Sequence, residues 1–207
     1  MSTPTWTETF VAAGEALEAL AGSLTQEQLG TGVPATPLWT ALEVYAHLAG
    51  VGTSVVTGAM AGAPGPDWTA AHVAQRQGRA LSDLVAEIRA CESEVAGIIA
   101  QAHRPAIVWD RVVHLADITE ALGLEPLAQP LWERILTSFA ERAFRELPLT
   151  VRAGEWTFGA GGPLVTVDPY ELFRIHFSRR SRAQVQAVFG DVLTAEQQDA
   201  LQIFGPQ

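Results

Sequence analysis

Residues 109–123, WDRVVHLADITEALG, place an aspartate and a histidine four positions apart in a largely apolar helical run. Side chains at this spacing project from the same face of a helix, one turn apart. A carboxylate oxygen of Asp110 and an imidazole nitrogen of His114 can therefore coordinate one metal ion at about 2.0 to 2.2 Å. Pro105 precedes the run and Gly123 follows it, so we predict a helix that begins after the proline and ends at the glycine.

A third ligand must come from another helix, and His47 is the candidate because helix bundles build metal sites from facing helices. Three protein ligands leave a position open for water, a thiol or a substrate, which is typical of catalytic sites. Asp117, three residues further along the same helix, could orient the ring of His114 or face solvent. The spacing alone also fits a surface pair or a hydrogen-bonded core histidine. The other histidines have no comparable partners and are interpreted as ordinary surface or half-buried residues: His72, His103 and His176.

The composition restricts the partners and the compartment. With 13 basic and 23 acidic residues the net charge is -10, which argues against nucleic acid as the main partner. Because Cys91 is the single cysteine, an internal disulfide and a cysteine-based zinc site are excluded, and a reducing cytoplasm fits best. Cys91 itself is interpreted as a core residue. Residues 1–10 show no secretory signal, and the uncharged segment 44–66 is rich in Gly, Ser and Thr. We interpret this segment as a core helix entering a loop, not a membrane span.

The periodicity of apolar residues defines the organisation of the chain. Apolar residues at steps of three and four predict helices. The predicted helices cover residues 7–24, 68–102, 106–123 and 127–147, and a further helix begins within residues 39–48. Thr40 and Glu43 have the spacing of a capping box at the start of the second helix. Alternating β-branched residues then predict strands at 149–158 and 162–168. Helical patterns return at 169–191 and 194–204.

This order predicts a mainly α protein with a small mixed region at its end. We expect a helical bundle over residues 1–125, a connecting helix over 126–148, and a small α+β domain over 149–207.

Two segments, TPLWTALEVYAHLAG at 36–50 and WDRVVHLADITEALG at 109–123, together resemble the signature segments of the mycothiol-dependent maleylpyruvate isomerase family. The positions that carry the resemblance are Trp39, Thr40, His47, Leu48, Asp110, His114, Asp117, Ile118 and Gly123. The resemblance implies a DinB-like four-helix bundle in which His47, Asp110 and His114 hold a divalent metal, usually zinc. The family glutamate is Asp110 here, one methylene shorter, so the site must be tighter, rearranged or lost. Glu43 is an alternative ligand, although its capping role is favoured.

The resemblance continues beyond the bundle. Residues 149–191 are similar to the small C-terminal α+β domain of the family, which has the fold of sterol carrier proteins. A Gly-Arg pair near its end corresponds to Ser178 and Arg179. The match implies that Arg179 is a catalytic and cofactor-binding residue that contacts a carboxylate of the substrate or thiol cofactor, since guanidinium suits bidentate binding. For Arg180 and Arg182 a solvated helix face is at least as good an interpretation.

The family resemblance implies a cytoplasmic, metal-dependent enzyme, typical of actinobacteria, that activates mycothiol for attack on an electrophilic small molecule. Isomerisation and S-transfer would use the same residues. Two other functions stay open on the sequence. The chain could be a remodelled relative that binds or transforms a specialised metabolite without a thiol, or a metal-free interaction protein whose histidines are core residues.

Overall fold

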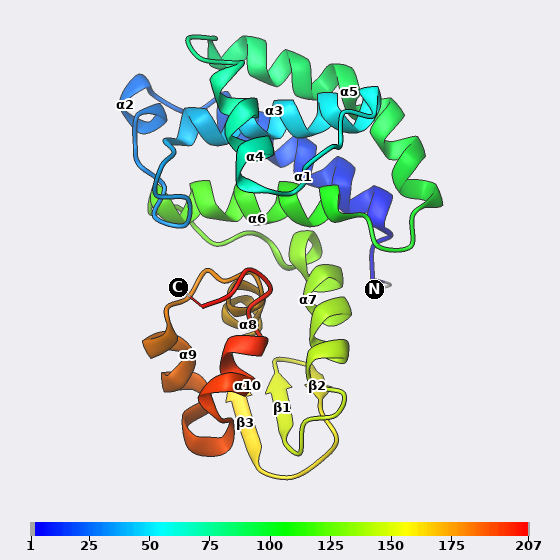
Figure 1. Cartoon of the computed structure of the whole chain (residues 1–207), viewed down its shortest axis with the longest axis vertical. Helices are drawn as coiled ribbons and strands as arrows, with labels where there is room; N and C mark the ends of the chain where they lie inside the picture. The colour runs from blue at the N-terminus through cyan, green and yellow to red at the C-terminus, as the bar shows by residue number, and fades with distance from the viewer. Residues whose placement is uncertain (1–2, 207) are drawn as a thin grey trace. The chain divides into compact units, whose positions relative to one another are not determined.

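The computed structural model describes residues 3–206 and divides the chain into two compact units. The N-terminal unit comprises Pro4–Leu131, and residues 132–206 lie in the C-terminal unit. The N-terminal unit is helical, and the C-terminal unit adds a three-stranded sheet (Figure 1). The predicted fold class, a helical bundle followed by a small α+β region, is confirmed.

Four long helices build the N-terminal unit (Figure 1). They are α1 (Trp6–Ala21), α3 (Ala41–Thr57), α5 (Leu81–Gln101) and α6 (Ala106–Ala121). Two shorter helices, α2 (Gln26–Leu29) and α4 (Pro66–Ala74), lie between them. Helix α3 packs against α4, α5 and α6, and α1 packs against α5 and α6. This central position of α3 brings its side chains close to three other helices.

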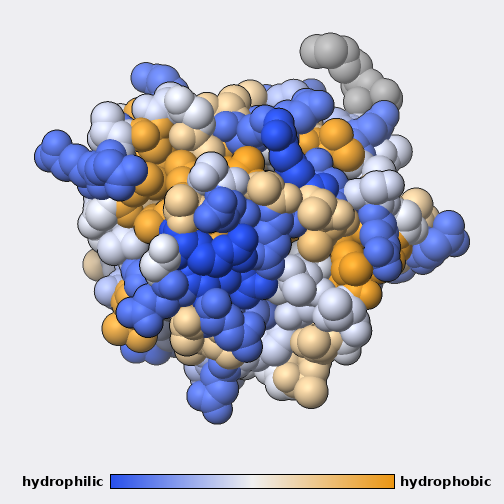
Figure 2. Space-filling model, turned by 90° about the horizontal axis from the view of Figure 1, so that it is seen from above, coloured by the Kyte–Doolittle hydropathy of each residue, from blue (hydrophilic) through white to orange (hydrophobic). Residues whose placement is uncertain are grey.

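The apolar faces of these helices form two buried clusters. One includes Leu17, Val44, Leu48, Leu84 and Leu115, and the other comprises Phe10, Val95, Ile99 and Val108. On the outside, the face of the N-terminal unit seen in Figure 2 has hydrophilic side chains gathered at its centre, with hydrophobic ones in separate areas around them. Within residues 3–206, no helix is long and apolar enough to cross a membrane.

The start of α3 is fixed by the predicted capping box. Thr40 Oγ1 accepts a hydrogen bond from the Glu43 backbone N–H at 3.4 Å, and Glu43 Oε2 accepts one from the Thr40 N–H at 2.7 Å. The reciprocal bonds satisfy two amide groups that have no partner within the helix. The capping role of Glu43 is therefore confirmed.

The predicted single helix over 68–102 is wrong, because the chain breaks it into α4 and α5. Gly78 has φ of +76° in the connecting turn, a conformation that only glycine adopts without strain. Arg76 and Arg79 on this turn both pair with Glu87 of α5. These contacts reverse the chain and lay α4 against α3.

The C-terminal unit combines a sheet of order β2-β1-β3 with short helices. Strand β1 (Thr150–Ala153) is antiparallel to β2 (Trp156–Phe158), as a hairpin requires, and parallel to β3 (Leu164–Val167). The helices are α7 (Gln129–Ala143), which begins in the N-terminal unit, α8 (Pro169–His176), α9 (Arg182–Phe189) and α10 (Ala195–Ala200), with a 3₁₀ turn, η1 (Gly190–Val192).

The predicted helix over 169–191 is also interrupted. Helix α8 ends at His176, and Ser181 caps the start of α9. Between them, Ser178 has φ of 58°. This left-handed residue turns the chain where a continuous helix was predicted.

Candidate metal centre

Three side chains from two helices converge inside the N-terminal unit. His47 comes from α3, and Asp110 and His114 come from successive turns of α6. Asp110 Oδ1 lies 3.4 Å from His47 Nε2 and 3.5 Å from His114 Nε2. Each residue offers one ligand atom, and the three atoms lie within 4.8 Å of one another. The three residues predicted as metal ligands are thus neighbours in space.

These separations match the needs of a small divalent ion. Ligand atoms at about 2.0 to 2.2 Å from a tetrahedral ion lie about 3.3 to 3.6 Å from each other. Both distances from Asp110 Oδ1 fall in this range. The donor set of two imidazoles and one carboxylate also suits zinc, so the residues fit the metal that the sequence implies. The shorter Asp110 reaches both histidines without the extra methylene of a glutamate.

His114 contacts a buried carboxylate through Nδ1, the ring nitrogen that does not face Asp110. Its Nδ1 lies 3.0 Å from Asp117 Oδ2, and Asp117 is only 1% exposed. When Asp117 is ionised it accepts the Nδ1 proton of His114, which leaves a lone pair on Nε2, the nitrogen on the side of Asp110, for a metal. The predicted pairing of Asp117 with His114 is confirmed.

His72 was missed by the sequence interpretation, which assigned it to the surface or to a half-buried position. It is 3% exposed, and its Nδ1 lies 3.5 Å from Nδ1 of His47. Burial, followed by the nearby cationic forms of His47 and Arg76, lowers its pKa to about 4, so the ring is neutral near pH 7. The sequence offered only a weak signal, Gly78, which lies in the turn that separates α4 from α5. His103, by contrast, is exposed as predicted.

A network of ionic contacts closes the turn between α4 and α5. Arg76 donates through Nε to Glu87 at 3.1 Å, Arg79 pairs with the same carboxylate, and Thr53 of α3 donates to it at 2.6 Å. Burial would raise the pKa of Glu87, but these hydrogen bonds outweigh it and lower the pKa to about 2. One carboxylate therefore links α3, α5 and the turn after α4.

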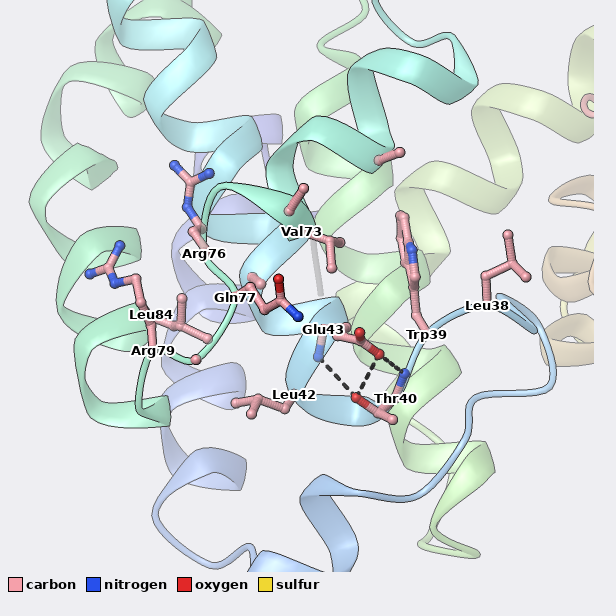
Figure 3. A pocket seen from close by; sticks show the side chains of 14 residues that line it. Leu38, Trp39, Thr40, Leu42, Glu43, Val73, Arg76, Gln77, Arg79 and Leu84 are labelled. Atoms are coloured by element: carbon pink, nitrogen blue, oxygen red, sulfur yellow. Dashed lines mark hydrogen bonds between the residues drawn. The ribbon is translucent and has the colours of Figure 1, made fainter.

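A groove of about 470 Å³ is lined by residues of α3, α4, α5 and the segments before α3 and after α4 (Figure 3). Leu42, Val73 and Leu84 supply apolar walls, and Gln77 and Arg79 supply polar ones. Trp39 also lines the groove, and its ring centroid is 4.9 Å from that of His47 and 6.1 Å from that of His114. The Trp39 indole thus borders both the groove and the ligand cluster.

The predicted cofactor contact, Arg179, lies in the C-terminal unit after α8. Its Nη1 donates to the backbone carbonyl of Phe177 at 2.9 Å. Its neighbours in the arginine-rich segment form ion pairs, Arg180 with Glu171 and Arg182 with Asp199. The role of Arg179 stays a prediction.

Comparison with known protein families identifies a family for this chain. The sequence pattern of the mycothiol maleylpyruvate isomerase N-terminal domain family matches residues 10–126, more than half of the 207-residue chain. The matched range contains His47, Asp110 and His114. No curated protein and no solved structure matches.

Proposed function

The chain belongs to the mycothiol maleylpyruvate isomerase N-terminal domain family, and on this premise we propose that it is a metal-dependent enzyme using a low-molecular-weight thiol. The metal is zinc, the thiol is mycothiol, and the reaction is isomerisation or S-transfer on an electrophilic small molecule. The observation that carries this proposal is the convergence of His47, Asp110 and His114, in which Asp110 Oδ1 lies at the separations of a tetrahedral ligand set from Nε2 of both histidines. A bound divalent metal lowers the pKa of a thiol and so supplies thiolate at neutral pH.

Each residue of the ligand cluster would contribute differently to binding such an ion. His47 and His114 offer neutral Nε2 atoms, and Asp110 offers one negative charge. Asp117 keeps the proton of His114 on Nδ1. The indole of Trp39 lies near the rings of both histidines and also lines the groove. We propose that the groove receives one of the two reactants.

The nucleophile must come from outside the protein in this proposal. Cys91 is half-buried on α5, with its Sγ 4.0 Å from Thr53 Oγ1, and it is not part of the ligand cluster. An external thiolate would add to a conjugated double bond of the substrate. Rotation followed by elimination returns the isomer and the thiol, whereas release of the adduct completes a transfer. Arg179 is proposed to contact a carboxylate during this reaction, as a catalytic and cofactor-binding residue.

A second function deserves the same test because of Asp110. Asp110 is one methylene shorter than a glutamate, and a centre remodelled in this way could transform a specialised metabolite without a thiol. In both functions the metal is present, and thiol dependence separates them. We place either activity in the cytoplasm, where a thiol cosubstrate stays reduced.

Metal content of protein purified without a histidine tag tests the proposal. By elemental analysis, wild type and the exposed control His103→Ala should hold close to one zinc per chain, and His114→Ala close to none. Mycothiol should then accelerate consumption of a conjugated cis-alkene acid or a chromogenic aryl halide by wild type but not by His114→Ala. Absence of metal from wild type after incubation with zinc would contradict the metal centre. Turnover without thiol would favour the second function.

A further inference from the structure

One face of α3 is built around a histidine of another helix. His47, Gly50 and Ser54 follow at steps of three and four residues and therefore share a face. All three lie against His72 of α4. A Cβ atom at position 50 would overlap the Cβ, Cγ and Cδ2 atoms of His72, so this close approach requires the glycine. Ser54 Oγ lies 3.0 Å from His72 Nε2.

The contact between the two imidazoles restricts where their protons lie. The two Nδ1 atoms are 3.5 Å apart, so a hydrogen bond between them needs one proton and one lone pair. If His47 donates through Nδ1, its Nε2 keeps a lone pair that a metal can use. Without a metal, the 3.4 Å contact between His47 Nε2 and Asp110 Oδ1 is a hydrogen bond only when Nε2 carries the proton, because a carboxylate oxygen only accepts. If His72 donated instead, neutral His47 would carry its proton on Nε2 and could not use that atom as a ligand. Only the first arrangement is compatible with a metal on His47 Nε2.

We propose that His72 is a positioning residue that holds His47 in the Nδ1–H tautomer and fixes its ring, so that Nε2 is presented to the metal. This inference rests on the proposed metal centre. His72 accepts through Nδ1 and donates through Nε2 to Ser54 Oγ. His72 does for His47 what Asp117 does for His114, and outer partners of this kind orient metal-binding histidines generally.

The choice of an imidazole rather than a carboxylate follows from charge. Asp110 and Asp117 already supply two negative charges, which balance a divalent cation. A third carboxylate behind His47, in the 3%-exposed position of His72, would be costly to bury and would reduce the electrophilicity of the metal. A neutral imidazole orients His47 without adding charge.

The surroundings of His72 hold its ring in place. Trp68, one turn earlier on α4, lies edge to face with it at a centroid distance of 4.1 Å. Arg76, one turn later, donates through Nη1 to the His72 carbonyl at 3.1 Å and pairs with Glu87. The position of His72 thus depends on the turn that brings α4 onto α3.

Zinc affinity of the full chain, measured by competition with a chromophoric chelator, tests the role of His72. His72→Leu removes the acceptor and should raise the zinc Kd about 10- to 100-fold, the usual effect of losing an outer partner. In His72→Asn the amide oxygen takes the place of Nδ1, so the Kd should stay within about threefold of wild type. The exposed control His103→Leu should bind zinc like wild type. Thermal unfolding of each metal-free variant reports on folding.

Nitrogen-15 NMR of the histidine rings in zinc-loaded wild type gives a readout that needs no variant. It should show His47 protonated on Nδ1 and His72 protonated on Nε2, with Nδ1 of His72 unprotonated. A proton on Nδ1 of His72, or an unchanged zinc Kd in folded His72→Leu, would overturn the inference alone. Equal losses of affinity in the Leu and Asn variants, matched by lower unfolding temperatures, would make His72 a packing residue only. Absent zinc binding in wild type would contradict the proposed metal centre and, with it, this role of His72.

Discussion

His47 in the N-terminal unit and His176 in the C-terminal unit are equally buried, each 1% exposed, but their surroundings differ. The ring nitrogens of His47 face Asp110 on one side and His72 on the other. His176 donates through Nδ1 to the Leu201 carbonyl at 3.0 Å, and its ring packs near Phe139 and Phe144. Burial of a histidine therefore does not identify a site. Convergence of ionisable groups from different helices does.

The surroundings of His176 predict the largest effect, which is on stability. Burial, opposed by its bond to the Leu201 carbonyl, lowers its pKa to about 4, against 6.5 in the unfolded chain. Between these values the unfolded state binds more protons, so the free energy of unfolding falls as the pH is lowered from 6.5 to 4. The contribution lost is about 3 kcal/mol. At pH above 6.5 it is fully present.

Urea unfolding at several pH values between 7 and 4 measures this loss. Other groups titrate in the same window, so the wild-type slope must be compared with that of His176→Asn, which keeps an amide donor for the Leu201 carbonyl. The variant should be less stable near pH 7 but have a shallower slope. Equal slopes would show that His176 is not held neutral by burial, and the contrast with His47 would then weaken.

Which features of the fold and of the candidate metal centre could be predicted depends on how far apart in the sequence the interacting residues lie. The spacing of Asp110 and His114 and the capping box at Thr40 are local, and they were predictable. His72 was not, because a single glycine costs a helix only about 1 kcal/mol, so Gly78 did not mark a break by itself. The ion pairs of Glu87 with Arg76 and Arg79 join the turn after α4 to α5, between residues 8 to 11 positions apart in the sequence.

A second experiment tests the comparison between the two units by changing Asp117, the hydrogen-bond partner of His114. Asp117→Asn keeps the size of the side chain but removes its charge, and its amide can present a donor to Nδ1. We expect the zinc Kd to rise about 10- to 100-fold, because the variant no longer holds the proton of His114 on Nδ1 and so no longer keeps Nε2 free to bind zinc. Chelator competition measures this change. His176→Asn, the matched substitution in the other unit, should leave the zinc Kd unchanged, and an equal loss in both variants would indicate a general effect on folding.

The smallest expected effect concerns backbone conformation. Among residues 3–206, every residue with positive φ except Ser178 is a glycine. Ser178 is 2% exposed, and its Oγ accepts a hydrogen bond from the Phe204 N–H at 3.0 Å. The left-handed conformation costs about 1 to 2 kcal/mol for a residue with a Cβ, and a hydrogen bond contributes about 1 kcal/mol. The hydroxyl thus offsets much of the strain of the left-handed conformation at this position.

Two substitutions separate these contributions. Ser178→Ala keeps the strain and loses the hydrogen bond, so urea unfolding should show a stability about 1 kcal/mol lower. Ser178→Gly loses the same bond but relieves the strain, so its stability should stay close to that of wild type. If glycine were as destabilising as alanine, the strain would be negligible and Ser178 would be retained for its hydroxyl alone. The C-terminal unit would then differ from the N-terminal one in its buried histidine but not in backbone strain.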